Sequence, residues 1–319
     1  MLTAFNEQKE RILAQHAQKE ITYFCPVCHE PLVLKQGYKN IAHFAHRHQT
    51  SHCAHGESML HYQLKLHIFR ELSKSHVDVQ LEPYIHEIQQ IPDIVVGHTA
   101  IEIQLSRLSI DLIRQRTEGL ERNGYQVIWL TLLPKYKNGV YTLNQLQQAC
   151  IDPKHCMLYG IHPFTHRVYR LYHMMGLSSR QFHADCEPMD YQQLSEVQEG
   201  KYSEMTIVRK LSTTRILQHI IQCRRKNTVH EPTLSMMYHM KFSDTQVVQL
   251  TGYIFPEQIY IYTHPVEWQL KLLETISQQH NPFEALQRYL KFRYFAKESL
   301  PHQQIVAQLV QRYRKIMKI

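Results

Sequence analysis

The sequence of 319 residues predicts a mixed α/β fold in three parts. Between residues 56 and 135, apolar residues change between helical and strand spacing in the order helix, three strands, helix, strand. Before this core, residues 1–55 contain paired cysteines and histidines, and after it, residues 136–319 contain several stretches of helical periodicity. We therefore expect an N-terminal arm with a small metal-binding module, an α/β core, and a basic, mainly helical C-terminal domain.

The first helix and first strand of the core are expected between residues 57 and 85. From Glu57 to Lys74, apolar residues recur every four positions, the spacing of one helical face: Leu60, Leu64, Ile68 and Leu72. From Val77 to Ile85, apolar and polar residues alternate as in a half-buried strand, and Pro83 indicates an edge strand or a bulge. The core therefore begins with a helix followed by a strand.

A hairpin with two acidic residues is expected next, from Ile91 to Ser106, where a turn separates two short apolar runs. Glu102 and Gln104 share one face of the second strand, and Asp93 lies in the first run. Two carboxylates beside a polar third residue make an oxygen-rich site for Mg²⁺ or Mn²⁺, which can activate water for attack on a phosphodiester. The alternative interpretation is that these residues occupy the solvent face of an amphipathic hairpin.

The last two elements of the core follow the hairpin. Helical spacing runs from Ile110 to Arg122, and Asn123-Gly124 supplies a stop signal. Residues from Tyr125 to Leu132 form a continuous apolar run, which predicts a buried strand.

This order of elements, with Asp93 and Glu-x-Gln at its centre, resembles the PD-(D/E)xK core of restriction-type nucleases. More narrowly, the chain resembles the competence protein CoiA family. The segments that carry the likeness span about half of the chain: Phe24-Cys25-Pro26-Val27-Cys28, Gly37 through His43-Phe44-Ala45-His46, Glu57-Ser58 with His61, Pro92-Asp93, Ile101 to Ser106, and Val127-Ile128-Trp129. The resemblance implies an α+β, restriction-endonuclease-like core and a role in natural transformation, in which imported DNA is processed and recombined.

The resemblance also implies roles for the hairpin residues. Asp93 and Glu102 would hold the catalytic Mg²⁺, and Gln104 stands where the family of nucleases usually has a lysine. A lysine positions the attacking water and stabilises developing negative charge, whereas a glutamine orients water only through neutral hydrogen bonds. The departure at Gln104 leaves two functions open, an active nuclease and a DNA-binding protein that keeps the fold without the reaction.

Three further residues of the core have two interpretations each. Glu57 resembles an acidic residue that some of these nucleases add to the metal shell, but a glutamate at a helix start is also favoured by the helix dipole. Ser106 and Arg116 could contact phosphate, or they are a strand-end serine and a solvated arginine.

The N-terminal module contains a second set of candidate metal ligands. Cys25-x-x-Cys28 and His43-x-x-His46 have the spacing of a structural zinc site, and Cys53 could replace one histidine. Free thiols or a redox Cys-x-x-Cys motif are the alternatives, but no thioredoxin-like βαβ pattern surrounds the cysteines. A zinc-ribbon-like module with structural Zn²⁺ is therefore expected.

Positive charge is concentrated in the second half of the chain. The net charge is +8; residues 1–150 hold 15 Lys and Arg against 14 Asp and Glu, whereas residues 151–319 hold 21 against 14. Such a surplus attracts a phosphate backbone, although it also serves solubility. The expected contacts are the run Arg224, Arg225 and Lys226 and the tail from Arg312 to Lys318, with Tyr313 or Tyr294 stacking on bases.

Composition limits the remaining possibilities. No apolar run approaches the roughly 20 residues of a membrane span, no secretory signal is visible at the start, and seven cysteines make a disulfide scaffold a poor fit, so a cytoplasmic protein is expected. No Walker motif is present, which argues against an ATP-driven helicase.

The expected function is DNA processing in competence by a Mg²⁺-dependent nuclease; the alternative is an inactive accessory protein that holds single-stranded DNA for a recombinase. The expected partner is DNA, above all single-stranded DNA, together with recombination or competence proteins; the sequence leaves open whether the chain forms a homo-oligomer.

Overall fold

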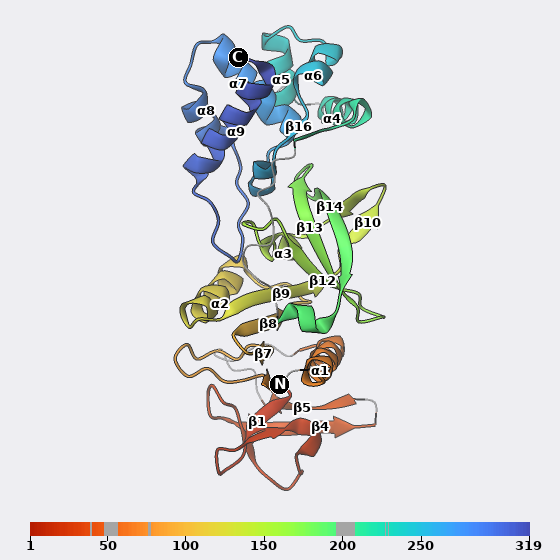
Figure 1. Cartoon of the computed structure of the whole chain (residues 1–319), viewed down its shortest axis with the longest axis vertical. Coiled ribbons are helices and arrows are strands. Elements are labelled where there is room, and N and C mark those ends of the chain that lie inside the picture. Colours follow the sequence, from red (N-terminus) through yellow and green to blue (C-terminus); the bar gives the residue numbers. More distant parts are fainter. Residues whose placement is uncertain (39, 48–56, 76–77, 196–207, 227, 229) are drawn as a thin grey trace. The chain divides into compact units, whose positions relative to one another are not determined.

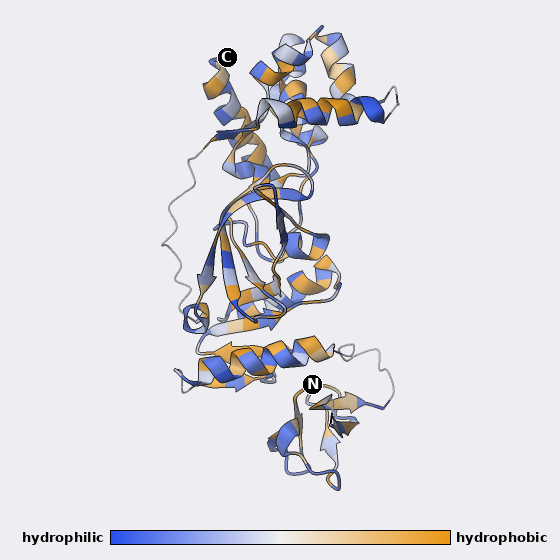
Figure 2. Cartoon of the chain, turned by 90° about the vertical axis from the view of Figure 1, so that its right-hand side faces the viewer, coloured by the Kyte–Doolittle hydropathy of each residue, from blue (hydrophilic) through white to orange (hydrophobic). Residues whose placement is uncertain are grey.

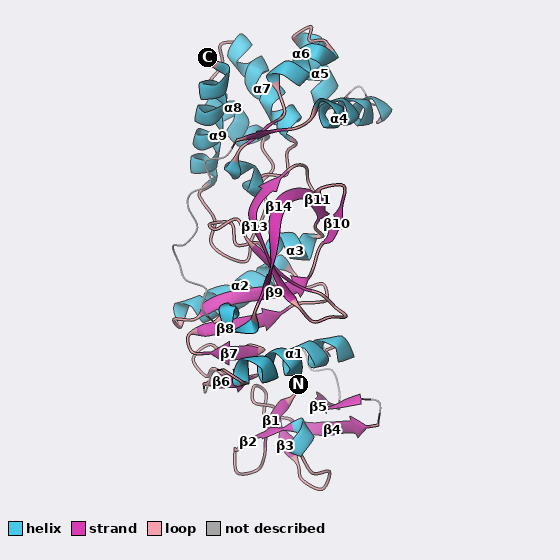
Figure 3. Ribbon diagram, turned by 45° about the vertical axis from the view of Figure 1, so that its right-hand side comes forward, coloured by secondary structure: helices cyan, strands magenta, loops and turns pink. Residues whose placement is uncertain are grey.

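The computed structural model describes residues 1–38, 40–47, 57–75, 78–195, 208–226, 228 and 230–319. The chain divides into two compact units. Unit 1 comprises Met1–Leu133, Tyr159–Arg170 and Glu187–Glu199, and unit 2 comprises Pro134–Leu158, Leu171–Cys186 and Gly200–Ile319. Figure 1 labels the elements along the chain, and Figure 3 distinguishes helices from strands.

The N-terminal part of unit 1 is a small antiparallel sheet. Its strand order is β2-β1-β3-β4-β5, drawn in red in Figure 1. The elements are β1 (Thr3–Phe5), β2 (Arg11–Leu13), the short helix η1 (Ala14–His16), β3 (Tyr23–Phe24), β4 (Pro31–Gly37) and β5 (Asn40–His46). Apolar side chains such as Tyr23, Leu32 and Phe44 are buried against one another and form a small core of its own.

The core of unit 1 has the predicted order of helix, three strands, helix, strand. Its elements are α1 (Met59–Ser73), β6 (Val79–Leu81), β7 (Ile94–Val96), β8 (Thr99–Ile103), α2 (Ile110–Arg122) and β9 (Gln126–Leu132). Ser58 and Ser109 cap the two helices by accepting backbone N–H groups, which explains why the helices begin there. Strands β6, β7 and β8 pair in antiparallel fashion. Strands β8 and β9 are parallel, because α2 connects the end of β8 to the beginning of β9.

Burial of both faces explains the continuous apolar strands. Ile101 and Ile103 on β8 and Ile128 and Leu130 on β9 belong to one apolar cluster that also contains residues of α1. Figure 2 shows hydrophobic and hydrophilic residues on both strands and helices. The sheet of unit 1 continues with β12 (Leu158–Ile161), which pairs with β9 in parallel.

Unit 2 combines strands with a helical region. Strand β10 (Lys135–Lys137) pairs with β11 (Val140–Thr142), which pairs in turn with β14 (Gln181–Met189). Between β11 and β14 in sequence lie α3 (Gln145–Ala149) and β13 (Val168–Gly176). The helical region contains α4 (Thr213–Arg225), α5 (Pro232–His239), α6 (Asp244–Leu250), α7 (Pro265–Ser277), α8 (Pro282–Tyr289) and α9 (His302–Met317), with β15 (Arg209–Lys210), β16 (Tyr253–Ile254) and η3 (Pro256–Tyr260).

The structure therefore differs from the expectation of a mainly helical region directly after residue 135. Apart from the short α3, the described α-helices of this part of the chain begin at Thr213, and most of the elements in residues 135–189 are strands. These strands lack strict alternation; β13, for example, buries residues irregularly along its length, so that its pattern carries no clear strand period. The chain also returns to unit 1 at Tyr159–Arg170 and Glu187–Glu199, the second of which contains η2 (Tyr191–Leu194). Among the described residues, no helix is long and apolar enough to cross a membrane.

Candidate active site and metal-binding clusters

Asp93 connects the hairpin to the first helix. It lies just before β7, where the register of Ile94 with Ile101 places it across from Glu102. One carboxylate oxygen, Oδ2, accepts the backbone N–H of Ile103 at 2.8 Å and lies 3.1 Å from Nε2 of His61. The other oxygen, Oδ1, lies 2.8 Å from Nζ of Lys65. Asp93 is therefore fixed by β8 and α1 together.

One face of α1 supplies two of the other residues of this cluster. His61 and Lys65 are four residues apart, so that they lie on the same side of the helix, and Glu57 directly precedes the N-cap Ser58. Lys65 is only 1% exposed, and its ammonium lies 2.7 Å from Glu57 Oε1 and 2.7 Å from Glu82 Oε1. Glu57, His61 and Asp93 offer ligand atoms that lie within 4.8 Å of one another, a spacing that could hold a metal ion. We call Glu57, His61, Lys65, Glu82 and Asp93 the carboxylate cluster.

Glu82 connects the carboxylate cluster to the N-terminal sheet. Its second oxygen, Oε2, accepts the backbone N–H groups of Leu2 at 2.7 Å and Thr3 at 2.9 Å. Glu82 has a positive φ of 51° directly after β6, which lets its side chain turn toward α1 and β1. The position of β1 and the position of Lys65 therefore depend on the same carboxylate.

Charges in the carboxylate cluster are set by these contacts. Burial alone would raise the pKa of Asp93, but the charges of Lys65 and His61 outweigh it and hold the pKa below its ordinary range. Burial alone would lower the pKa of Lys65, but Asp93, Glu82 and Glu57 raise it well above the ordinary value. Asp93 is therefore ionised and Lys65 is protonated at neutral pH.

Glu102 has a different environment from Asp93. Its two oxygens lie 2.7 and 2.8 Å from one nitrogen of Arg116, which comes from α2. Burial raises the pKa of Glu102 to about 7, and this effect outweighs the attraction of Arg116. Glu102 therefore exchanges a proton near neutral pH while Asp93 keeps its charge.

Gln104 and Ser106 interact with each other at the end of β8. The side-chain amide of Gln104 donates to the backbone carbonyl of Ser106 at 2.8 Å. Gln104 is neutral, and the positive charge beside Asp93 belongs to Lys65. Lys65 and Gln104 are 39 positions apart in the sequence. Sequence reasoning did not single out Lys65 or Glu82; the available signal was the His61-x₃-Lys65 spacing on one helical face.

The N-terminal module brings together three of its four expected zinc ligands. Cys25, Cys28 and His46 offer ligand atoms within 4.8 Å of one another, and Cys28 Sγ lies 3.2 Å from Nε2 of His46. His43 lies apart from this group, because its Nδ1 is 2.8 Å from the carbonyl of Ile41 and its ring stacks on Tyr62 of α1. Cys53 lies outside the described residues.

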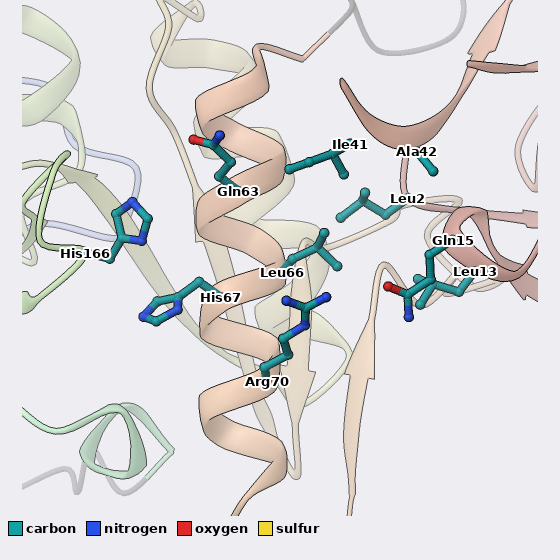
Figure 4. A pocket seen from close by; sticks show the side chains of 10 residues that line it. All are labelled: Leu2, Leu13, Gln15, Ile41, Ala42, Gln63, Leu66, His67, Arg70 and His166. Carbon is teal, nitrogen blue, oxygen red and sulfur yellow. The ribbon is translucent and has the colours of Figure 1, made fainter. Parts of the chain in front are cut away.

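A pocket of about 510 Å³ lies on another side of α1. Figure 4 shows Gln63, Leu66, His67 and Arg70 of α1 on one side of it and residues of the N-terminal sheet on the other. The ring of His67 lies 5.1 Å from the ring of His166, and its Nε2 lies 3.0 Å from the hydroxyl of Tyr191. These contacts fix the histidine wall of the pocket.

Of the expected DNA contacts Arg224, Arg225 and Lys226, two lie beside carboxylates. Arg224 pairs with Asp244 at 2.9 Å, Lys226 lies 3.4 Å from Glu231, and Arg225 is exposed. Tyr313 is fully buried and its hydroxyl donates to the carbonyl of Leu250 at 2.7 Å, so the expectation that it stacks on bases is wrong. Tyr294 is exposed.

Comparison with known proteins identifies the same two parts. Residues 5–56 match the family model for the N-terminal domain of competence protein CoiA, and residues 57–199 match the model for its nuclease-like domain. Competence protein CoiA of Bacillus subtilis (strain 168) is 32% identical over 135 residues, which is 40% of this chain and 36% of that protein. No solved structure matches the chain. The chain belongs to the competence protein CoiA family and has a nuclease-like domain.

Proposed function

We propose that residues 57–199 form a metal-dependent deoxyribonuclease that hydrolyses phosphodiester bonds of incoming DNA during competence. The observation that carries the proposal is the convergence of Glu57, His61 and Asp93 within 4.8 Å, beside Glu102, in a domain that matches a nuclease-like family model. Such a buried group of carboxylates is costly to assemble unless a cation compensates it. A restriction-endonuclease-like core is the fold we propose for these elements.

The donor set fits a hard divalent cation. Carboxylate oxygens of Asp93, Glu102 and Glu57 are the ligands that Mg²⁺ prefers, and the imidazole of His61 makes Mn²⁺ an equally suitable ion. Lys65 already places a positive charge among these carboxylates, which supports the idea that the site stabilises cations. A bound Mg²⁺ or Mn²⁺ would lower the pKa of a water and stabilise the leaving oxygen.

We propose that Lys65 supplies the positive charge that a lysine at position 104 would otherwise provide. Its ammonium is protonated and held beside Asp93, whereas the amide of Gln104 donates to Ser106. A fixed ammonium can stabilise negative charge that develops on phosphate oxygens, which a neutral amide does less well. Arg116 would hold Glu102 in place and lies close enough to carry further positive charge to the site.

The second candidate is an accessory protein that holds single-stranded DNA without cutting it. One observation favours it: Arg116 and Lys65 already form ion pairs of 2.7 and 2.8 Å with Glu102 and Asp93. Internal cations of this kind could stabilise the fold without a metal. The two functions therefore differ in whether a divalent ion displaces these contacts.

Cleavage of labelled single- and double-stranded DNA, linear and circular, tests the proposal. We expect cutting with Mg²⁺ or Mn²⁺, none with EDTA, and loss of cutting in Asp93→Asn, which keeps the shape of the side chain. Glu118→Gln is the matched control, because Glu118 pairs with the exposed Arg122 on the outer side of α2. Binding without cutting by the wild type under all these conditions would favour the accessory function, and cutting by Asp93→Asn would place the active site elsewhere.

We also propose that Cys25, Cys28 and His46 hold a structural Zn²⁺. Thiolates and imidazole are the ligands that zinc prefers, and these three lie together although they come from a turn and from β5. The fourth ligand we propose is Cys53, which sequence spacing places shortly after His46.

A further inference from the structure

Unit 2 contains a wide, basic groove of about 1110 Å³. Its walls come from the turn between β10 and β11, the segment before β14, the start of α4 and the start of α7. Five basic side chains line it: Lys137, Arg180, Arg215, Lys226 and Lys291. We call this the basic groove.

Most of these cations are available for a ligand. In the part of the chain that the structure describes, no ion pair joins Lys137, Arg180, Arg215 or Lys291 to a carboxylate, and Lys226 lies 3.4 Å from Glu231. The acidic residue in the lining is Glu267, which accepts a hydrogen bond from the hydroxyl of Tyr289 at 2.9 Å. Burial raises the pKa of Glu267, so its charge opposes an anion less than an exposed glutamate would. The groove therefore carries a clear positive surplus.

The backbone adds to this surplus. Helices α4 and α7 both begin at the groove, where their caps Ser212 and His264 are part of the lining. A helix N-terminus presents free N–H groups and a partial positive charge, which favour phosphate oxygens. Two helix N-termini and five cationic side chains therefore all favour an anion in the basic groove.

The wall that carries Arg180 is held in place from behind. Arg293 is buried, and its guanidinium donates to the carbonyls of Ser178 at 2.8 Å and Ser179 at 2.9 Å. The same guanidinium lies over the rings of Phe182 and Tyr262, at 4.7 and 4.4 Å from their centroids. These contacts hold the backbone of the segment before β14 in place, and with it the backbone of Arg180.

Two stacked, uncharged histidines are also part of the lining of the groove. The rings of His219 and His264 lie 3.6 Å apart and are nearly parallel. Burial lowers the pKa of His219 to about 4 and that of His264 well below its ordinary value, so neither is protonated at neutral pH. The positive charge of the groove therefore lies on its lysine and arginine side chains, while the two histidines add uncharged aromatic surface.

We propose that the basic groove binds the phosphate backbone of single-stranded DNA. The proposal rests on the DNA-processing function proposed above, because that function requires the protein to hold a strand. Proteins that bind single strands use a positively charged groove that follows the backbone, with aromatic side chains beside it. A flexible single strand can bend to bring its phosphates to cations that surround one hollow, whereas a stiff duplex bends at a cost.

Fluorescence anisotropy of a labelled thymidine oligonucleotide with the full chain, in EDTA to prevent cutting, tests the proposal. Arg180→Glu/Arg215→Glu should weaken binding at least about tenfold, and the slope of log Kd against log salt should fall by about 1.4, which is about 0.7 for each lost phosphate contact. The matched control is Lys19→Glu/Lys154→Glu, which changes the net charge equally at two exposed lysines that lie outside the groove and outside the segments expected to contact DNA. Equal weakening by the control variant, or unchanged binding by the groove variant, would overturn the proposal.

Two further measurements keep the result interpretable. If the groove variant unfolds at a lower temperature, Lys137→Gln/Lys291→Gln replaces it, since both lysines are exposed and should weaken binding about fivefold or more. A duplex or inorganic phosphate that competes with the oligonucleotide as well as unlabelled single strand does would also contradict the proposal. Failure of the nuclease proposal looks different: the Asp93→Asn variant and the wild type would both bind DNA through the groove, and neither would cut it.

Discussion

Replacement of Lys65 by methionine should cause a large loss of stability. Methionine keeps the length of the side chain, but it removes the ammonium that lies 2.7 to 2.8 Å from oxygens of Glu57, Glu82 and Asp93. Removing one partner of a buried ion pair costs roughly 3–5 kcal/mol, because the remaining charge is left uncompensated. Asp93 and Glu82 retain backbone N–H donors, so we expect about 3 kcal/mol, the lower end of this range.

Urea unfolding at several pH values measures this effect. Since Lys65 holds the pKa of Asp93 and Glu82 below their ordinary values, its stabilising effect is present above about pH 4 and is lost as the pH falls further. The difference between the wild type and Lys65→Met should therefore shrink in acid. Lys74→Met is the control, because Lys74 is exposed at the end of the same helix and pairs with the solvent-facing Glu71. A loss in Lys65→Met no greater than in Lys74→Met would refute the reasoning.

Three other predictions concern metals and the basic half. Affinity for Mn²⁺ should rise from about pH 6 to about pH 8 as Glu102 loses its proton. Titration calorimetry should show a smaller rise in Glu102→Gln, where His61, whose pKa burial alone would lower but Asp93 raises, is the remaining group that must lose a proton. Metal analysis should find about one equivalent of zinc, which is lost in Cys28→Ser and retained in Cys186→Ser, a change at an exposed cysteine far along the chain. Tyr313→Phe should cost about 1 kcal/mol through its lost hydrogen bond, and anisotropy should find DNA affinity unchanged because this ring is buried.

Local spacing was enough to predict the core of unit 1. Its two helices have serine caps and apolar residues on one face, and α2 begins and ends at the residues that the pattern indicated, Ile110 and Arg122. The hairpin was also predictable, because a short turn brings Asp93 and Glu102 onto neighbouring strands whatever surrounds them. These features depend on residues that are close in the sequence.

Other features depend on contacts between distant residues, which spacing does not reveal. In the sequence, Lys65 is indistinguishable from any other polar residue of an amphipathic helix. It becomes the centre of a buried cluster because the fold brings Glu82 and Asp93 next to it. The same is true of His43, which shares the His-x-x-His spacing with His46 but stacks on a ring of α1. In unit 2, Arg180 and Arg215 are 35 positions apart and meet at one groove.

The balance of charge in the carboxylate cluster favours the nuclease over the accessory function. Glu57, Glu82 and Asp93 surround Lys65, and the N-terminal ammonium lies 3.8 Å from Glu57. His61 adds positive charge only when it is protonated. Glu102 and Arg116, in contrast, form a pair with no surplus. While His61 is neutral, as a metal ligand must be, the cluster retains one negative charge after Lys65 and the N-terminal ammonium are counted, and a buried surplus of this sign favours a further cation. A divalent ion is the cation for which Glu57, His61 and Asp93 have the spacing. Stabilisation of the wild type by Mn²⁺ in thermal unfolding, reduced in His61→Ala, would agree with this balance, whereas equal stabilisation of both would show that the ion binds elsewhere.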